Sequence, residues 1–83
     1  MPEITPRQAA ADLLLWIDSD TRFLVERRQD VPALPSVTRS LLEAVARGEA
    51  ADPQQFEQAL AAGQQFRQRL SFIYLKSSPK AEQ

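Results

Sequence analysis

The chain has 83 residues and a mass of 9.3 kDa, which suffices for one small domain with a thin hydrophobic core. Ten basic and eleven acidic side chains give a net charge of −1, which argues against a general nucleic-acid binder or a polybasic membrane anchor. The sequence contains no cysteine and no histidine, so disulfides, zinc fingers and catalysis by either residue type are excluded. Because no apolar run is long enough to span a membrane and Met1-Pro2-Glu3 does not open like a signal peptide, we expect a cytoplasmic protein with a single helical domain over residues 1–83.

The first predicted helix covers residues 6–29. Thr5-Pro6-Arg7-Gln8 combines a hydroxyl at the N-cap, proline at the first helical position and glutamine at the third. Apolar side chains then recur every three or four residues and define one face: Ala9, Ala10, Leu13, Leu14, Trp16, Ile17, Phe23 and Leu24. The short polar side chains of residues 18–21 compete for backbone hydrogen bonds, but the apolar stripe keeps its phase across them, so we expect one continuous helix.

Two prolines in the segment 30–35 interrupt this helix and predict a linker. A shorter helix is expected over residues 36–47. Its apolar face consists of Val37, Leu41, Ala44 and Val45, and Gly48 is placed to end it in a left-handed conformation.

A third helix is predicted over residues 53–76, because Asp52 supplies an N-cap, Pro53 the first position and Gln55 a capping-box partner. Its apolar face consists of Phe56, Ala59, Leu60, Gly63, Phe66, Leu70 and Ile73. Gly63 is expected to permit the close approach of another helix. Residues 77–83 are predicted to be a disordered tail.

The two long helices are expected to lie antiparallel, with the short helix across one face. The fold class predicted is therefore all-α, a small three-helix bundle built on a long antiparallel helical hairpin. This pairing sets acidic side chains of the first helix against basic ones near the end of the third: Glu3, Asp12, Asp18 and Asp20 against Arg67, Arg69, Lys76 and Lys80.

No constellation in the sequence supports catalysis, metal binding or cofactor binding. Asp18-Ser19-Asp20 opens like a calcium loop, but Phe23 replaces the glycine needed at position six and Gln29 the glutamate needed at position twelve. Two glycines cannot build a phosphate-binding loop. We therefore expect neither an enzyme nor a small-molecule substrate.

Two stretches, residues 13–17 and 70–75, carry more apolar side chains than one helical face accommodates. In the antiparallel hairpin both stretches fall near the same end. We expect them to form one partner-binding patch, with Leu15, Trp16, Phe72, Tyr74 and Leu75 as its residues. The alternative is that the short helix, Ile4 or the tail covers this surface.

These observations predict a small cytoplasmic, bacterial protein–protein interaction module, an adaptor or regulator that self-associates as a homodimer. One alternative is an accessory subunit of a larger enzyme or nucleic-acid complex. Another is a weak nucleic-acid binder that uses two basic clusters, Arg22, Arg27 and Arg28 in the first helix and Arg67, Arg69 and Lys76 in the third. The antiparallel hairpin places these clusters at opposite ends, which disfavours the second alternative.

Overall fold

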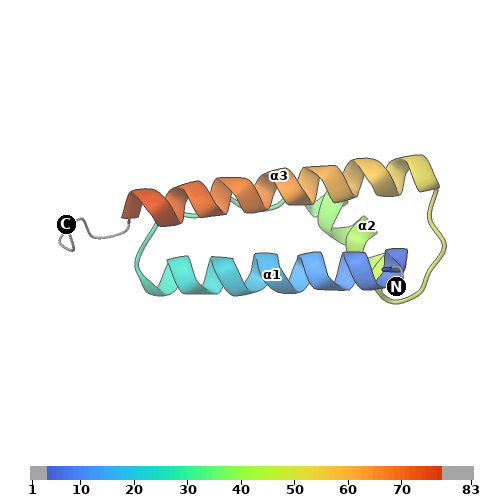
Figure 1. Ribbon diagram of the computed structural model, residues 1–83, viewed down its shortest axis with the longest axis horizontal. Helices are drawn as coiled ribbons and strands as arrows, with labels where there is room; N and C mark the ends of the chain where they lie inside the picture. The colour runs from blue at the N-terminus through green and yellow to red at the C-terminus, as the bar shows by residue number, and fades with distance from the viewer. Residues whose placement is uncertain (1–3, 78–83) are drawn as a thin grey trace.

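The computed structural model describes residues 4–77, which form three helices: α1 (Pro6–Glu26), α2 (Ser36–Ala46) and α3 (Pro53–Ser77) (Figure 1). Within these residues there is no strand, and the helices pack on one another. The predicted all-α three-helix bundle is confirmed. Of the predicted tail, Ser77 belongs to α3, and residues 78–83 lie outside the described part of the chain.

All three helices start where the sequence predicts, and side chains cap the two long ones. The Thr5 hydroxyl accepts a hydrogen bond from the Gln8 N–H at 3.1 Å, and the Asp52 carboxylate accepts one from the Gln55 N–H at 3.1 Å. Each cap satisfies a backbone donor that has no partner within its helix. As expected, α1 continues without interruption through residues 18–21.

Both α1 and α2 are followed by a residue with positive φ, two positions after the last helical residue. After α2, Gly48 has φ +94°, as predicted, and its N–H donates to the carbonyl of Val45. After α1, Arg28 has φ +63°, its N–H donates to the carbonyl of Val25, and the Gln29 N–H donates to that of Leu24. This hydrogen-bond pattern stops a helix. It explains why α1 ends at Glu26 and not at the predicted residue 29.

The two long helices are parallel, so the predicted antiparallel hairpin is wrong. Asp20 lies near Arg67 and Phe23 contacts Tyr74, so residue numbers increase in the same direction along both helices. Figure 1 shows both helices running from right to left. The chain reverses at each of its two connections, residues 27–35 and 47–52. Two reversals return α3 to the direction of α1 and leave α2 antiparallel to both.

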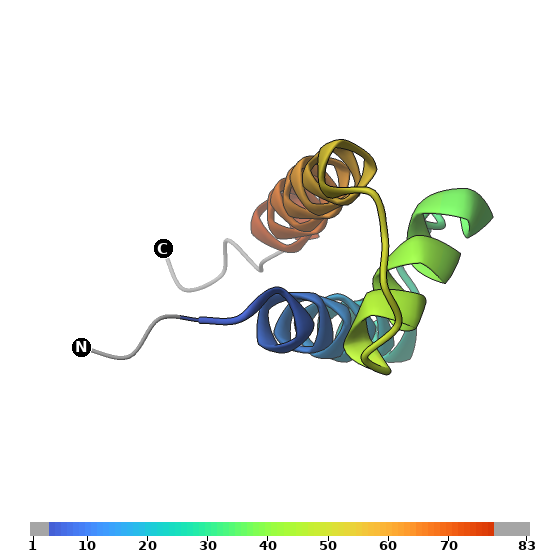
Figure 2. The same cartoon turned by 90° about the vertical axis from the view of Figure 1, so that its right-hand side faces the viewer.

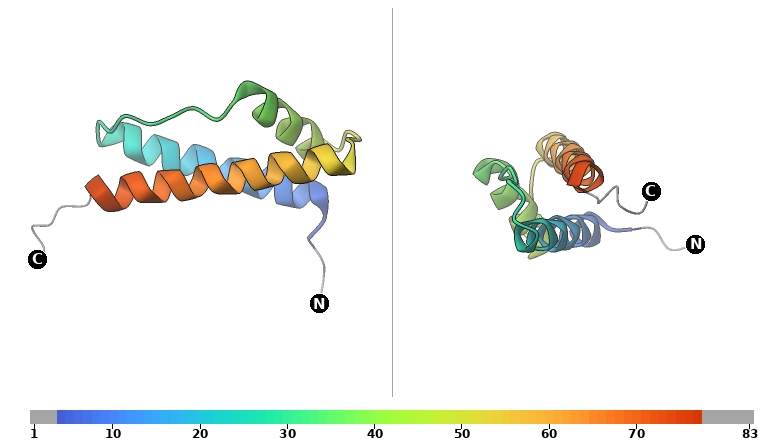
Figure 3. Two further views of the ribbon diagram at one scale, coloured as in Figure 1. Left: turned by 90° about the horizontal axis from the view of Figure 1, so that it is seen from above. Right: turned by 90° about the vertical axis from the view of Figure 1, so that its left-hand side faces the viewer.

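Polar contacts join α2 to α1. The Arg39 guanidinium donates to the Asp18 carboxylate at 2.6 Å, and Arg7 Nε donates to the carbonyl of Ala46 at 3.2 Å. The pKa of Arg39 is raised, chiefly by its hydrogen bond with Asp18. These contacts hold α2 beside the N-terminal halves of the long helices (Figure 3). Over the C-terminal halves, the linker contributes the buried side chain of Leu34.

Within the described residues, the core consists of eleven buried apolar residues from all three helices and the linker: Ala10, Leu13, Leu14, Ile17, Leu24, Leu34, Leu42, Val45, Ala59, Phe66 and Leu70. On α2 the predicted face is partly wrong, because Val37 is 80% exposed while Leu42 is fully buried. The short helix packs between two neighbours, so Leu41 and Leu42 both contact apolar side chains. On α1, Trp16 and Phe23 belong to the predicted apolar face but are exposed.

Gly63 marks the place where the three helices meet. A Cβ atom at this position would lie 2.5 Å from Leu13 Cδ2 of α1 and 3.5 Å from Leu42 Cδ1 of α2. The expectation that Gly63 permits a close approach is confirmed. This approach sets the spacing of α1 and α3.

Candidate interaction groove

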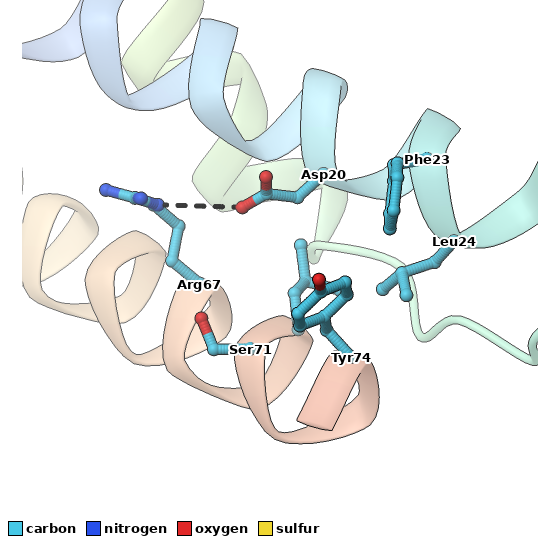
Figure 4. A pocket seen from close by; sticks show the side chains of 7 residues that line it. Asp20, Phe23, Leu24, Arg67, Ser71 and Tyr74 are labelled. Atoms are coloured by element: carbon cyan, nitrogen blue, oxygen red, sulfur yellow. Dashed lines mark ion pairs between the residues drawn. The ribbon is translucent and has the colours of Figure 1, made fainter. Parts of the chain in front are cut away.

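The face of the α1–α3 pair that points away from α2 is an open surface of the fold. Seen along the bundle from either end, α2 lies on one side of the two long helices, and no other helix of residues 4–77 lies on the opposite side (Figures 2 and 3). Side chains from α1 and α3 line a groove there (Figure 4). We call it the α1–α3 groove.

The α1–α3 groove has a volume of about 350 Å³. Its lining residues are Asp20, Phe23, Leu24, Arg67, Leu70, Ser71 and Tyr74. The buried side chains of Leu24 and Leu70 form an apolar floor, whereas the aromatic rings stand at the exposed rim. The groove therefore combines an apolar base with a rim that is accessible to another molecule.

Two aromatic rings stand at one end of the groove, and an arginine contacts one of them. The centroids of the Phe23 and Tyr74 rings lie 5.5 Å apart with their planes at 51°, a tilted arrangement that aromatic pairs favour. The Arg27 guanidinium lies 4.1 Å from the centroid of the Phe23 ring, within the range of a cation–π interaction. These contacts order side chains that are nevertheless exposed.

Arg67 links the two helices at the other end of the groove. Its guanidinium lies 5.1 Å from the centroid of the Trp16 ring, and its Nε lies 3.9 Å from Asp20 Oδ2. That separation allows an ion pair but is too long for a hydrogen bond. Among the described residues, the buried Arg67 Nε makes no hydrogen bond. Coulombic attraction to Asp20 and cation–π attraction to Trp16 hold this charge at the rim.

The side chains that line this groove are mainly apolar, aromatic and charged. Its only carboxylate, Asp20, is engaged with Arg67, and within the described residues no cluster of acidic side chains is suited to holding a metal ion. Aromatic and arginine side chains are enriched among the residues that dominate binding at protein interfaces.

Of the five predicted partner-binding residues, two lie at this face. Tyr74 lines the groove, and Trp16 contacts Arg67 at its rim. Leu15 is exposed and lies one residue, about 100°, around α1 from Trp16, on the outer side of the helix. Leu75 is likewise about 100° around α3 from Tyr74. Phe72 lines a different hollow beside the linker.

The predicted single patch is therefore not formed. It assumed antiparallel helices, which set the stretches 13–17 and 70–75 near the same end of the hairpin. In the parallel pair, Trp16 is level with Arg67 and Phe23 with Tyr74, so the two apolar stretches are offset by about two helical turns. Whether Leu15, Phe72 and Leu75 bind partners stays a prediction.

The predicted partner-binding patch did not include Phe23, Asp20 or Arg67. The signal was present as a seven-residue spacing, from Trp16 to Phe23 on α1 and from Arg67 to Tyr74 on α3. Seven residues make nearly two turns, so each pair shares one helical face. Only the parallel orientation aligns the two pairs with each other.

Parallel packing also gives the bundle two ends of opposite charge. The basic end, residues 20–30 and 67–77, has six basic and three acidic side chains, a net charge of +3. The other described residues, 4–19 and 31–66, have three basic and six acidic side chains, a net charge of −3, and we call this part the acidic end. The two basic clusters therefore lie at the same end, contrary to the expectation from the antiparallel hairpin.

Comparison with protein-family models, curated proteins and solved structures finds no match to this chain. In the described residues, none of the helices is both long and apolar enough to cross a membrane.

Proposed function

We propose that this protein is a protein–protein interaction module, an adaptor or regulator, that binds its partner through the α1–α3 groove. The observation that carries the proposal is the row of exposed aromatic side chains, Trp16, Phe23 and Tyr74, along one open face. A helix that serves only its own fold needs one apolar stripe facing the core. Here α1 carries exposed aromatic rings in addition to that stripe.

Burial of these rings provides the driving force for binding. Full burial of a large apolar side chain contributes about 1.5–3 kcal/mol, and the half-exposed rings of the groove retain a substantial part of that amount for a partner. Contacts with Arg27 and Arg67 already order Phe23 and Trp16. The loss of side-chain entropy on binding is correspondingly smaller.

The shape of the face favours a helical partner. Two parallel helices with side chains between them form a long groove, and an amphipathic helix places its apolar face into such a groove. The partner would present apolar side chains at intervals of three, four or seven residues.

A matched pair of variants tests this proposal. Trp16→Asp and Leu15→Asp each replace an exposed apolar side chain of α1 by a carboxylate, at adjacent positions on different faces. The immobilised wild-type protein and both variants are used to capture proteins from the source organism, with identification by mass spectrometry. Circular dichroism first establishes that both variants are folded.

We expect wild type and Leu15→Asp to retain the same partner and Trp16→Asp to lose it. Equal retention by both variants would contradict binding through the groove. Loss by Leu15→Asp alone would assign the partner to the outer face of α1. The identity of the captured protein also tests the alternative that this chain is an accessory subunit of a larger complex.

The charge distribution favours a second candidate function, weak nucleic-acid binding. The six basic side chains of the basic end lie at one end of the bundle, so they act on a phosphate backbone together. Three acidic side chains among them reduce this attraction. Heparin chromatography separates the two candidates: elution only at high salt supports nucleic-acid binding, and elution at low salt favours a protein partner.

A further inference from the structure

We propose that the partner in the α1–α3 groove is a second copy of this chain, packed antiparallel to the first about a twofold axis. The axis crosses the groove at the level of Trp16 and Arg67. This inference rests on the proposed function, because it names the occupant of the same groove. Three observations support it: the spacing of the side chains, the charges of the two ends and the area of the face.

Positions on α1 and α3 are spaced evenly on the two sides of one level. Trp16 and Arg67, which contact each other, mark that level. Seven residues towards the C-terminus, the rings of Phe23 and Tyr74 are in contact. Seven residues towards the N-terminus lie the half-buried Ala9 and Leu60.

A twofold axis at the central level exchanges these two outer positions. It places Phe23 of one copy over Ala9 of the other and Tyr74 over Leu60. A large ring then lies opposite a smaller side chain on both helices, which is how closely packed helical layers interdigitate. The Trp16 rings of the two copies meet at the axis, while each Arg67 charge is balanced by the Asp20 carboxylate of its own chain.

The charges of the two ends select the antiparallel orientation. The basic end carries a net charge of +3 and the acidic end −3. An antiparallel pair sets each basic end beside an acidic end, whereas a parallel pair sets like charges together. Complementary potentials of this kind fix the register and orientation of an interface.

The open face is large enough for a specific dimer. From Ala9 to Arg27, α1 extends about 27 Å, and two adjacent helices are about 20 Å wide. The face therefore offers about 540 Å² per copy, or about 1,100 Å² for the pair, which exceeds the roughly 1,000 Å² expected of a biological interface. A closed twofold pair is also the commonest way for identical chains to associate.

Sedimentation equilibrium on the intact chain tests association. At about 100 μM we expect wild type and Leu15→Asp to be dimers and Trp16→Asp to be a monomer, with a dissociation constant raised at least about tenfold. A wild-type monomer at this concentration would overturn the proposal. So would a dimer that persists in Trp16→Asp, or one that only Leu15→Asp disrupts.

A distance between labels tests the orientation. The chain has no cysteine, so Gln54→Cys supplies a single attachment site for a spin label at an exposed position of α3. Gln54 lies thirteen residues before Arg67, so the antiparallel dimer separates the two labels by about 40 Å along the helices. Electron–electron double resonance is expected to give this distance. A distance near 10–20 Å, as in a parallel dimer, would overturn the proposal.

These outcomes separate the inference from the proposed function. If wild type is a monomer but captures a partner that Trp16→Asp loses, the homodimer is contradicted and the proposed interaction module is supported. A protein that is monomeric and shows no difference between the two variants in capture removes both.

Discussion

Gly63→Ala tests the close approach that sets the spacing of α1 and α3. Two effects of opposite sign act at this position. Alanine is favoured over glycine in a helix interior by about 1 kcal/mol. Against this, the new Cβ would lie 2.5 Å from Leu13 Cδ2 and 3.3 Å from Leu13 Cγ, so the leucine side chain must move. Overpacking of this kind costs about 1–3 kcal/mol, and we expect a net destabilisation of about 1 kcal/mol.

The sign of this effect is expected to reverse when Leu13 is truncated. Leu13→Ala alone removes a buried side chain and costs about 2–5 kcal/mol. In that background the two clashing atoms are gone, so Gly63→Ala gains its helix propensity and fills part of the cavity. The double variant is then more stable than Leu13→Ala by about 1 kcal/mol. The coupling between the two sites is about 2 kcal/mol and favourable.

Urea unfolding of wild type, the two single variants and the double variant measures this cycle, with circular dichroism as the signal. An equal effect of Gly63→Ala in both backgrounds would refute the contact with Leu13. Stabilisation by Gly63→Ala in the wild-type background would show that the helices are farther apart than described here.

Two further predictions concern the ends of the helices. Arg28→Gly is expected to stabilise the fold by about 0.5–1 kcal/mol, because glycine adopts the observed φ of +63° without strain, and to raise the melting temperature by about 4 °C. The matched change Arg27→Gly is expected to lower the melting temperature, because Arg27 has a φ of −93° and the variant loses the cation–π contact with Phe23. A higher melting temperature for Arg27→Gly than for Arg28→Gly would contradict the hydrogen-bond pattern after α1. Asp52→Ala should cost about 1 kcal/mol through loss of the N-cap, and Asp18→Ala less, because its ion pair is largely exposed. A lower melting temperature for Asp18→Ala than for Asp52→Ala would contradict the role of Asp52 as the N-cap of α3.

Helix positions followed from the sequence wherever local chemistry decides them. Thr5 and Asp52 cap the backbone three residues away, and Gly48 adopts the conformation that glycine tolerates best. The end of α1 was not predictable in this way, since arginine at position 28 carries no signal for positive φ. Its conformation follows from the hydrogen bonds that end the helix and lead into the linker.

The orientation of the long helices depends on connections and not on pairwise complementarity. Acidic and basic side chains do meet between α1 and α3, as Asp20 and Arg67 show, but parallel and antiparallel pairs both permit such contacts. Two short connections require two reversals of the chain, and that constraint decides the orientation. The single predicted patch was wrong because it required antiparallel helices. The exposure of Trp16 and Tyr74 does not depend on the orientation of the helices.

The short length of α2 gives the bundle a gradient of local stability. Near Gly63, a residue of α3 has neighbours from both other helices, whereas the last turns of α3 line hollows with α1 and the linker. Segments with fewer buried contacts open at lower free energy, so we expect amide hydrogens near Tyr74 to exchange with solvent faster than those near Gly63. The aromatic end of the groove thus lies in the part of the fold that opens most readily. A molecule bound there slows exchange along the last turns of α3 and stabilises the segment that the core holds least.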